Sequence, residues 1–281
     1  MGRNRIILSG GGTGGHIYPA ISIANELKSR DNNSEILFVG ARDKMEMNIV
    51  PKYGFEILGL WISGFNRGKI FNNLLFPIKL LVSVFQSIIL IKKFKPDVVV
   101  GTGGYASGPT LYIANLFNIP TLIQEQNSYP GITNKILSKR VNTVCVAYRN
   151  LDKFFPKDKL VLTGNPVRSS ISSNEDYFDK GISHFKLDSN KKTLLVIGGS
   201  LGSREINKSI HSIIDYLKYL NLQVIWQCGK LYYDQYKSMV DSENIKLVDF
   251  LDEINLAFSV SDFIISRAGA SSVSELSIIG K

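Results

Sequence analysis

Residues 5–27 read RIILSGGGTGGHIYPAISIANEL, and this stretch decides the fold class. A short apolar run leads into a cluster of glycines, and residues 19–27 then carry apolar side chains at helical spacing. The same order starts again at residues 193–197, which precede a second glycine turn at 198–203 and helical spacing over 206–220. A strand, a glycine turn and a helix open a βαβ unit, so we expect an α/β protein with two doubly wound, Rossmann-like domains.

Further strands are predicted by apolar, β-branched runs without alternation, which are typical of a parallel sheet buried on both faces. They lie at residues 35–40, 96–101, 120–123, 144–147, 160–162, 223–227, 245–248 and 262–266. Residues 169–192 are rich in Ser, Asn, Asp and Lys and predict loop with at most short helices. We place the boundary between domains at residues 165 and 166.

The composition limits the classes of protein to which the chain can belong. A chain of 281 residues fits two domains of about 150 residues each, and 44% hydrophobic with 20% charged residues excludes a disordered chain. The two cysteines, Cys145 and Cys228, exclude a disulfide framework and a cysteine zinc site. The net charge of +9 favours an anionic partner, which can be a phosphate-bearing ligand, nucleic acid or an anionic membrane face.

The longest apolar stretch, residues 74–91, is interrupted by Pro77 and Lys79, and a spanning helix needs about 20 apolar residues. We therefore expect a helix that lies against an apolar surface and does not cross a bilayer. A stripe at helical spacing consists of Leu74, Ile78, Leu81, Phe85 and Ile88, beside Lys79, Lys92, Lys93 and Lys95. A basic rim around an apolar stripe suits an anionic leaflet, and the alternative is a helix packed on the sheet.

The glycine loop at residues 10–15 brings backbone N–H groups close to an anion, and the following helix N-terminus adds positive charge. The loop also satisfies G-x-G-x-x-G, which makes a dinucleotide site an alternative. The second strand ends in Arg42 without an acidic residue, so NADP fits this alternative better than NAD. His16 is expected in the loop at the start of the helix, either as a catalytic base or ligand contact, or as a capping or packing residue.

Three more segments lie at the carboxyl ends of predicted strands. Residues 101–108 form a second glycine loop, and residues 124–127 place polar groups where a buried strand has to satisfy them. Both should lie at the same face as His16. Residues 267–275 open a helix with small and hydroxyl side chains, which suits a pyrophosphate. Glu275, in its first turn, could accept hydrogen bonds from a ribose or form a capping box with Ser271 or Ser272.

Other chemistries lack their motifs. The chain has no Asp-x-Asp pair and no G-x-x-x-x-G-K-[ST] loop, which argues against a metal–diphosphate clamp and against an ATPase. His184 and His211 have no partner at ligand spacing. We therefore expect neither a metal nor a cofactor.

Taken in order, these motifs resemble the MurG family of bacterial glycosyltransferases of peptidoglycan synthesis, over essentially the whole chain. The matching segments are residues 11–16 with Pro19, 45–46, 50–52, 63–64, 95–99, 103–105 with 107–109, 125–127, 133–135, 164–168 and 198–200.

The resemblance implies a GT-B fold, in which two Rossmann-like domains face each other across a cleft. It implies inverting transfer of N-acetylglucosamine from UDP-GlcNAc to lipid I (undecaprenyl-pyrophosphoryl-MurNAc-pentapeptide), which forms lipid II for the cell wall, without a metal. Residues 1–165 then face the acceptor and the membrane, and residues 166–281 bind the UDP-sugar. The enzyme would sit peripherally on the cytoplasmic face of the cell membrane, near other cell-wall synthesis proteins, and would not bind nucleic acid.

The resemblance also implies roles for single residues. His16 is the first choice for the catalytic base and Glu125 the second, with the acceptor diphosphate on residues 11–15 and 103–104. Substrate contacts from the first domain are Thr13, Gly14, Gly15, Tyr105 and Asn127. Those of the donor site are Arg168, Ser200, Leu251, Ala270, Ser271, Ser272, Val273, Ser274 and Glu275.

The chain departs from the family in three places. Leu201 replaces the usual Gln, and Ser271-Ser272 replaces Leu-Thr. The family continues past Lys281, so the resemblance implies a C-terminally truncated second domain with an incomplete donor site. Two other functions stay open: an NADPH-dependent oxidoreductase, which does not explain the segments at 198–203 and 270–275, and a non-catalytic, membrane-associated binding protein.

Overall fold

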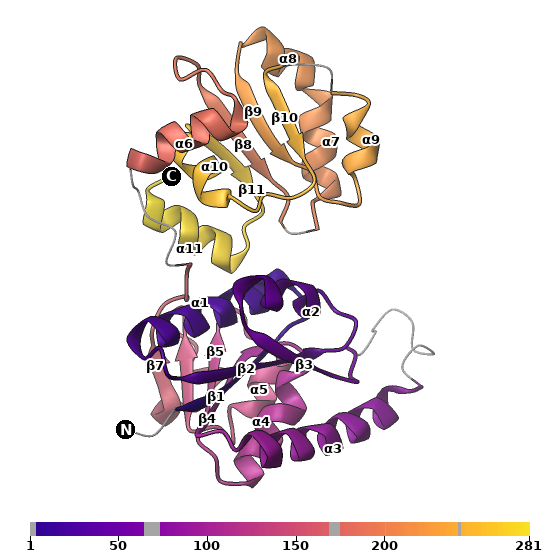
Figure 1. Ribbon diagram of the computed structural model, residues 1–281, viewed down its shortest axis with the longest axis vertical. Coiled ribbons are helices and arrows are strands. Elements are labelled where there is room, and N and C mark those ends of the chain that lie inside the picture. Colours follow the sequence, from indigo (N-terminus) through magenta and orange to yellow (C-terminus); the bar gives the residue numbers. More distant parts are fainter. Residues whose placement is uncertain (1–3, 65–73, 169–174, 200, 241–242) are drawn as a thin grey trace. The chain divides into compact units, whose positions relative to one another are not determined.

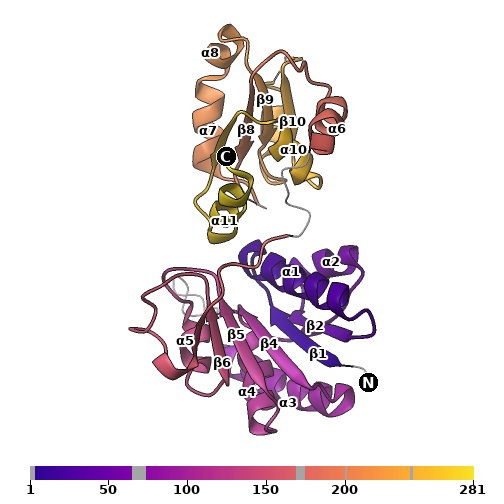
Figure 2. The ribbon, with the colours of Figure 1, turned by 90° about the vertical axis from the view of Figure 1, so that its left-hand side faces the viewer.

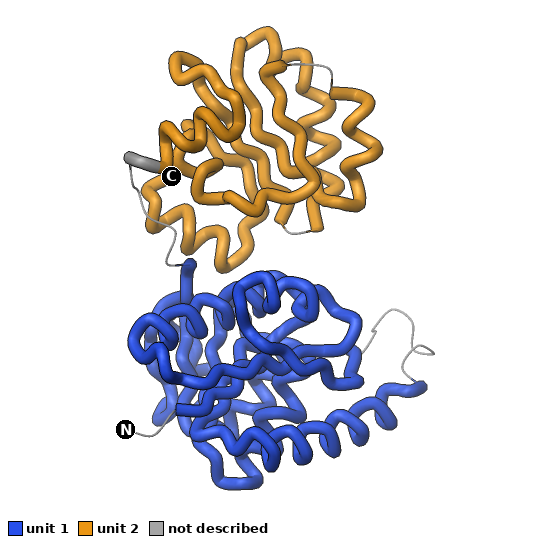
Figure 3. Tube along the Cα trace, viewed as in Figure 1, with its two compact units in different colours: residues 1–169 blue, residues 170–281 orange. Residues whose placement is uncertain are grey.

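The computed structural model describes residues 4–64, 74–168, 175–199, 201–240 and 243–281. The chain divides into two compact units, Met1–Ser169 and Ser170–Lys281 (Figure 3). This division lies four residues beyond the boundary expected between residues 165 and 166. Each unit is a parallel sheet with helices on both faces, as expected for a doubly wound fold (Figures 1 and 2).

The first unit holds seven parallel strands in the order β3-β2-β1-β4-β5-β6-β7. They are β1 (Arg5–Gly10), β2 (Glu35–Ala41), β3 (Glu56–Leu60), β4 (Val98–Gly103), β5 (Thr121–Glu125), β6 (Thr143–Val146) and β7 (Leu160–Leu162). Sequence analysis predicted all of them except β3. This edge strand buries only Leu60 fully, so it lacks the continuous apolar run of the central strands.

Helices cover both faces of this sheet (Figure 1). One face carries α1 (Gly14–Arg30), α2 (Glu46–Ile49) and the 3₁₀ helix η1 (Val50–Tyr53), and the other carries α3 (Phe76–Phe94), α4 (Ser107–Leu116) and α5 (Ile132–Leu137). A 3₁₀ turn, η3 (Lys157–Lys159), precedes β7. Strand β1 contributes side chains to the cores on both faces of the sheet. Ile6 and Leu8 pack with α1, whereas Ile7 packs with α3 and α4. Successive side chains of a strand point to opposite faces, so a strand buried on both sides has to be apolar throughout.

The second unit holds four parallel strands in the order β10-β9-β8-β11. They are β8 (Thr193–Ile197), β9 (Gln223–Gln227), β10 (Ile245–Val248) and β11 (Phe263–Ser266). One core, around Trp226, packs α7 (Arg204–Ser212), α8 (Ile214–Tyr219) and α9 (Tyr233–Lys237) on the sheet. The other core, around Leu195 and Ile225, packs α6 (Glu175–Phe185), α10 (Ile254–Val260) and α11 (Ala270–Ile279).

Three expectations about helices are wrong. Residues 175–185 form an eleven-residue helix where loop was expected, because Ile182 and Phe185 pack into the core beside α10. The single helix expected over 206–220 is broken at Ile213, which has a φ of −111° and a ψ of 11°. Helix α1 begins at Gly14, so His16 lies in its first turn and not in the preceding loop.

The strand order places the glycine loops. In each sheet the first strand lies between the second and the fourth, which makes β1/β4 and β8/β11 the points where the strand order reverses. Doubly wound sheets bind ligands at this switch point, outside the carboxyl ends of the strands. The loops after β1 and β4 flank it in the first unit, and those after β8 and β11 flank it in the second. The predicted fold class, two doubly wound parallel-sheet domains, is confirmed.

Candidate functional site

The two glycine loops of the first unit are packed backbone to backbone. The Gly11 N–H donates to the Gly103 carbonyl oxygen at 3.2 Å. Gly104 has a φ of +92°, and a Cβ there would lie 2.3 Å from the Gly11 carbonyl oxygen. The positive φ and the close approach to Gly11 both require glycine at position 104, because a side chain there would be strained and would push the loops apart.

His16 lies between these loops. A Cβ on Gly103 would lie 2.9 Å from His16 Nε2, so the imidazole rests directly against this glycine. His16 Nδ1 is 3.1 Å from the Gly11 carbonyl oxygen and 3.3 Å from Thr13 Oγ1. A carbonyl oxygen only accepts, so Nδ1 carries the hydrogen, and in the neutral ring Nε2 carries the lone pair. No hydrogen bond to Nε2 is found within the described part of the chain.

The surroundings of His16 keep its ring neutral. Burial lowers the pKa of His16 from its ordinary value of 6.5, although the hydrogen bond to Gly11 and the charges of Glu125 and Glu46 raise it in part. A pKa below 6.5 leaves the ring unprotonated at pH 7. A neutral imidazole whose lone pair is not engaged in a hydrogen bond can accept a proton, which is the requirement for a general base.

The polar end of β5 is buried and the oxygens of its carboxylate are hydrogen-bonded, although Gln126 Oε1 has no partner among the described residues. Glu125 Oε1 accepts hydrogen bonds from the backbone and side-chain nitrogens of Asn127, both at 3.0 Å. Its Oε2 accepts from the Gly131 N–H at 3.1 Å and from Asn134 Nδ2 at 2.9 Å. Gln126 Nε2 donates to the Thr102 carbonyl oxygen at 2.9 Å. The Glu125 carboxylate therefore organises the loop that follows it, and four donors surround its oxygens.

Glu46 lies in one of the segments that carry the family resemblance, but the sequence analysis gave it no role in the site. Its side chain is completely buried at the start of α2. Oε1 accepts the Ala41 N–H at 2.9 Å, and Oε2 accepts the Gly12 N–H at 3.0 Å. The sequence contained one indication of this contact, which is the glycine at position 40, at the end of β2. This glycine makes room for the Glu46 side chain, because a Cβ on Gly40 would lie 2.5 Å from Glu46 Cγ.

These bonds narrow the part of the first loop that can hold an anion. The Gly11 and Gly12 N–H groups are already donated to Gly103 and Glu46. Those of Thr13, Gly14 and Gly15, at the N-terminus of α1, donate no hydrogen bond to any described residue. A helix N-terminus with such groups is suited to an anion.

Tyr105 and Arg168 flank this site in the first unit. Tyr105 follows β4 and is 45% exposed, and its ring lies so close to Gly64 that a Cβ there would be 2.0 Å from Tyr105 Cζ. The Arg168 guanidinium lies 5.2 Å from the centre of the Tyr18 ring on α1. Arg168 therefore packs on the first unit, whereas the sequence analysis had grouped it with the second domain.

The second unit repeats a glycine turn after β8. The Gly199 carbonyl oxygen accepts from the Gly202 N–H at 2.9 Å and from Gln227 Nε2 at 2.8 Å. Ser200, a predicted donor contact, lies outside the described residues. Leu251 is only 6% exposed and packs in the core of this unit, so a ligand contact there would have to use its backbone.

The segment after β11 opens α11 at Ala270, with Gly269 as the N-cap. Neither Ser271 nor Ser272 caps the helix, so the capping-box alternative is wrong. Glu275 lies in the second turn and not in the first, and it is buried to 6% exposure. Ser271, Ser272 and Ser274 are half-buried beside it, and Val273 is exposed.

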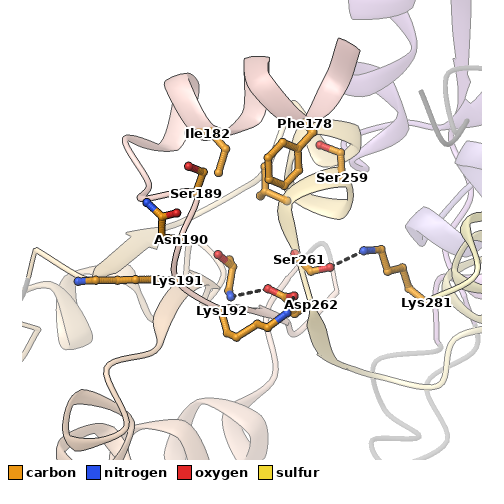
Figure 4. Close-up of a pocket in the computed structure, with 12 residues that line it drawn as sticks. Phe178, Ile182, Ser189, Asn190, Lys191, Lys192, Ser259, Ser261, Asp262 and Lys281 are labelled. Atoms are coloured by element: carbon orange, nitrogen blue, oxygen red, sulfur yellow. Dashed lines mark hydrogen bonds and ion pairs between the residues drawn. The ribbon is translucent and has the colours of Figure 1, made fainter. Parts of the chain in front are cut away.

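A pocket of about 280 Å³ lies elsewhere in the second unit, at the amino ends of β8 and β11 (Figure 4). Lys192 Nζ pairs with Asp262 Oδ1 at 2.7 Å, and Lys281 Nζ donates to the Ser261 carbonyl oxygen. The pocket is at the opposite end of the strands from the glycine turn and contains none of the predicted site residues. Across the described ranges, no group of three or more His, Cys, Asp or Glu side chains is arranged to hold a metal ion.

Two protein-family models match the chain. The glycosyltransferase family 28 N-terminal domain matches residues 6–146, and the glycosyltransferase family 28 C-terminal domain matches residues 193–281. These two segments contain the glycine loops described above.

Two similar proteins with curated names carry the same name. A Flavobacterium psychrophilum protein, "UDP-N-acetylglucosamine--N-acetylmuramyl-(pentapeptide) pyrophosphoryl-undecaprenol N-acetylglucosamine transferase", is 57% identical over 281 residues, which are 100% of this chain and 77% of that protein. A protein of the same name from Parabacteroides distasonis is 49% identical over 284 residues, again 100% of this chain and 77% of the relative.

Solved structures are similar as well. The crystal structure of Acinetobacter baumannii MurG is 27% identical, with a TM-score of 0.68 over 99% of this chain and 77% of that one. A UDP-GlcNAc 2-epimerase from Neisseria meningitidis, bound to UDP-GlcNAc, has a TM-score of 0.64 over 95% of this chain and 78% of that one. At 14% identity, the epimerase is similar in fold alone.

Proposed function

This chain belongs to glycosyltransferase family 28, and from that premise we propose that it transfers N-acetylglucosamine from UDP-GlcNAc to lipid I, which yields lipid II for peptidoglycan. The relatives of 49–57% identity are named for this reaction. The observation in the site that carries the proposal is His16, a partly buried imidazole with a lowered pKa, whose Nδ1 bonds to the Gly11 carbonyl oxygen and whose Nε2 carries the lone pair. An acceptor hydroxyl needs such a base.

The transfer is a single displacement at the anomeric carbon. The acceptor hydroxyl gives its proton to His16 Nε2, and its oxygen forms the new bond to the anomeric carbon of N-acetylglucosamine. The bond from that carbon to the diphosphate breaks at the same time, so UDP leaves with the electron pair and the configuration inverts. Thr13, Gly14 and Gly15 donate to the acceptor diphosphate from the start of α1, with Tyr105 and Asn127 positioning the acceptor.

The second unit holds the donor in this proposal. Ala270 to Ser274 open α11 at the carboxyl end of β11, where the helix dipole favours the negative charge that grows on UDP as it leaves. Glu275 accepts hydrogen bonds from the ribose hydroxyls, and the turn that includes Gly199 and Ser200 contacts the nucleotide sugar. Leu251 contributes its backbone, and Arg168 is a further contact to the donor in this proposal.

A transfer assay tests the proposal. Lipid I in detergent is incubated with radiolabelled UDP-GlcNAc without added metal, using this chain and a version extended to the length of its relatives. We expect labelled lipid II from the extended chain, and binding of UDP-GlcNAc but not of NADPH. A folded, extended chain that neither binds UDP-GlcNAc nor transfers sugar contradicts the proposal. Donor binding without turnover indicates a non-catalytic binding protein instead.

We further propose that α3 brings the enzyme to the cytoplasmic face of the cell membrane, where a soluble nucleotide sugar meets a lipid-anchored acceptor. Ser83, Ser87, Leu90 and Ile91 face the protein, and Ile88 also packs on the core, so its expected place in the exposed stripe is wrong. The outward face of α3 carries Ile78, Leu81, Phe85 and Ile89, and Leu74 and Leu75 precede the helix; each of these side chains is more than half exposed. Lys79 and Lys92 lie on the same helix, which suits an anionic leaflet.

We expect other cell-wall synthesis proteins at this face of the membrane. No helix in the described ranges is long and apolar enough to cross a bilayer.

The membrane proposal predicts that Leu81→Glu with Phe85→Glu weakens binding to anionic lipid vesicles by at least about tenfold, since burying one such side chain contributes about 1.5–3 kcal/mol. The matched control is Leu231→Glu with Tyr219→Glu, because these side chains are 77% and 83% exposed in the second unit. Vesicle co-sedimentation measures both pairs. Equal binding by the two double variants would rule out α3 as the membrane contact.

A further inference from the structure

Glu46 connects two segments that meet only in the folded chain. One carboxylate oxygen holds the Ala41 N–H at the end of β2, and the other holds the Gly12 N–H in the first glycine loop. The loop is shaped around this side chain, because a Cβ on Gly11 would lie 2.1 Å from Glu46 Oε1. Gly11 does not have a positive φ, so position 11 requires glycine for space and not for backbone conformation.

The Gly12 N–H belongs to the same peptide unit as the Gly11 carbonyl group. The chain has no cis peptide bond among the described residues, and in a trans peptide the N–H and C=O groups point in opposite directions. On one side of this unit the N–H donates to Glu46, and on the other side the C=O accepts from His16 Nδ1 at 3.1 Å. A single rigid plane therefore joins Glu46 to the imidazole.

We propose that Glu46 is a positioning residue for His16: by holding the Gly11–Gly12 peptide unit in one orientation, it fixes the tautomer in which Nε2 accepts the proton of the acceptor. This inference rests on the proposed function, since it assigns Glu46 a part in the same site. Glu46 does not touch the substrate and acts only through the peptide and the ring.

A fixed orientation matters because this peptide unit lies between two glycines. Glycine crosses between backbone conformations with little steric cost, and Gly12 already has a φ of +84°. If the unit flipped, its N–H would point at His16 Nδ1. The ring would then accept at Nδ1 and carry its hydrogen on Nε2, where it could no longer take a proton from the acceptor.

The first experiment is ¹⁵N NMR of the histidine rings in Glu46→Gln. A glutamine offers its carbonyl to only one of the two N–H groups and turns its NH₂ group toward the other, so the peptide unit is no longer held in one orientation. We expect His16 to change from the Nδ1–H form to a mixture of tautomers. His184 and His211, the only other histidines, report the unchanged fold. Glu26→Gln is the matched control, because Glu26 pairs with Arg30 on the surface of α1.

A pH titration of the same histidine signals gives a second readout. Glu46 and Glu125 are the two carboxylates whose charges raise the pKa of His16, and Glu46→Gln removes one of them. We expect the midpoint of the His16 titration to fall in Glu46→Gln and to stay in place in Glu26→Gln. An Nδ1–H ring that persists in a folded Glu46→Gln protein would overturn the proposal, whether or not the midpoint moves, because removal of the charge alone can lower the midpoint. No substrate is needed, so this result stands apart from the outcome of the transfer assay.

A double-mutant cycle tests the contact itself. Gly11→Ala pushes on the Glu46 carboxyl group and should lower both the unfolding temperature and the Nδ1–H population of His16. In Glu46→Ala the three atoms nearest to that Cβ are gone, so adding Gly11→Ala should cost little more. Additive effects of the two substitutions would mean that Gly11 is needed for another reason. In the transfer assay we expect Glu46→Gln to lower kcat in proportion to the Nδ1–H population of His16 that is lost, with KM for UDP-GlcNAc unchanged.

Discussion

His16→Asn should lower kcat for lipid II formation by about 10³-fold, within the range for loss of a positioned general base, while KM for UDP-GlcNAc stays nearly the same. Asparagine can still donate its side-chain N–H to the Gly11 carbonyl oxygen, so the loop keeps its bond to residue 16. What is lost is the basic Nε2. The measurement is steady-state transfer with lipid I or a soluble analogue, together with the unfolding temperature to show that the variant is folded.

The same variant decides the origin of the pH dependence. A base has to be unprotonated to act, so activity falls as the pH drops through the pKa of His16. Burial lowers the pKa of His16 in the free enzyme from its ordinary value of 6.5, so the acidic limb of the kcat/KM profile, which reports the free enzyme, should have its midpoint below 6.5. In His16→Asn this limb should disappear. An acidic limb that persists in the variant would assign the base to another group.

Two matched controls come from the chain itself. His184 lies on α6 beside Phe185, and His211 lies on α7 against the Tyr236 ring. Both are in the second unit, outside the candidate site. His184→Asn and His211→Asn should each keep the transfer rate and the acidic limb, which separates the role of His16 from a general effect of replacing histidine.

The central strands could be predicted from the sequence because burial on both faces leaves a continuous apolar run. Residues 193–197 and 223–227 are such runs, and the structure confirms both. Strand β3, at the edge of its sheet, is buried fully only at Leu60 and has no such pattern. Helix α6 was missed because its polar residues indicated loop, while Ile182 and Phe185 reveal an apolar face only when α10 is beside them.

The positions of the glycine loops could also be predicted, but not the reason for each glycine. Close approach of backbone N–H groups to an anion was the expected reason, yet Gly11 gives space to Glu46 and Gly104 gives space to the Gly11 carbonyl group. These contacts join residues that are far apart in the chain, so local sequence patterns do not contain them. For the same reason the tie between Gly12 and Glu46, 34 positions apart, appears only in the fold.

Glu125→Gln distinguishes the second candidate for the base from the first. The Glu125 oxygens accept four hydrogen bonds, from both nitrogens of Asn127, from Gly131 and from Asn134. Glutamine has one acceptor oxygen, so its NH₂ group faces two of these donors. Because breaking buried hydrogen bonds to a charged group leaves donors unpaired, we expect the free energy of unfolding to fall by about 2–4 kcal/mol. Denaturant unfolding measures this, with Glu205→Gln as a control at a side chain that is 75% exposed.

Transfer by folded Glu125→Gln should be slower, because the loop that carries Asn127 loses its anchor, but its pH profile should still show the acidic limb of His16. That limb should shift to lower pH, since the variant removes a negative charge that raises the pKa of His16. A base held by four donors has to give up hydrogen bonds before it can take a proton, whereas His16 Nε2 has none to lose among the described contacts. If Glu125→Gln abolishes the limb and His16→Asn leaves it, Glu125 is the base and His16 only shapes the loop.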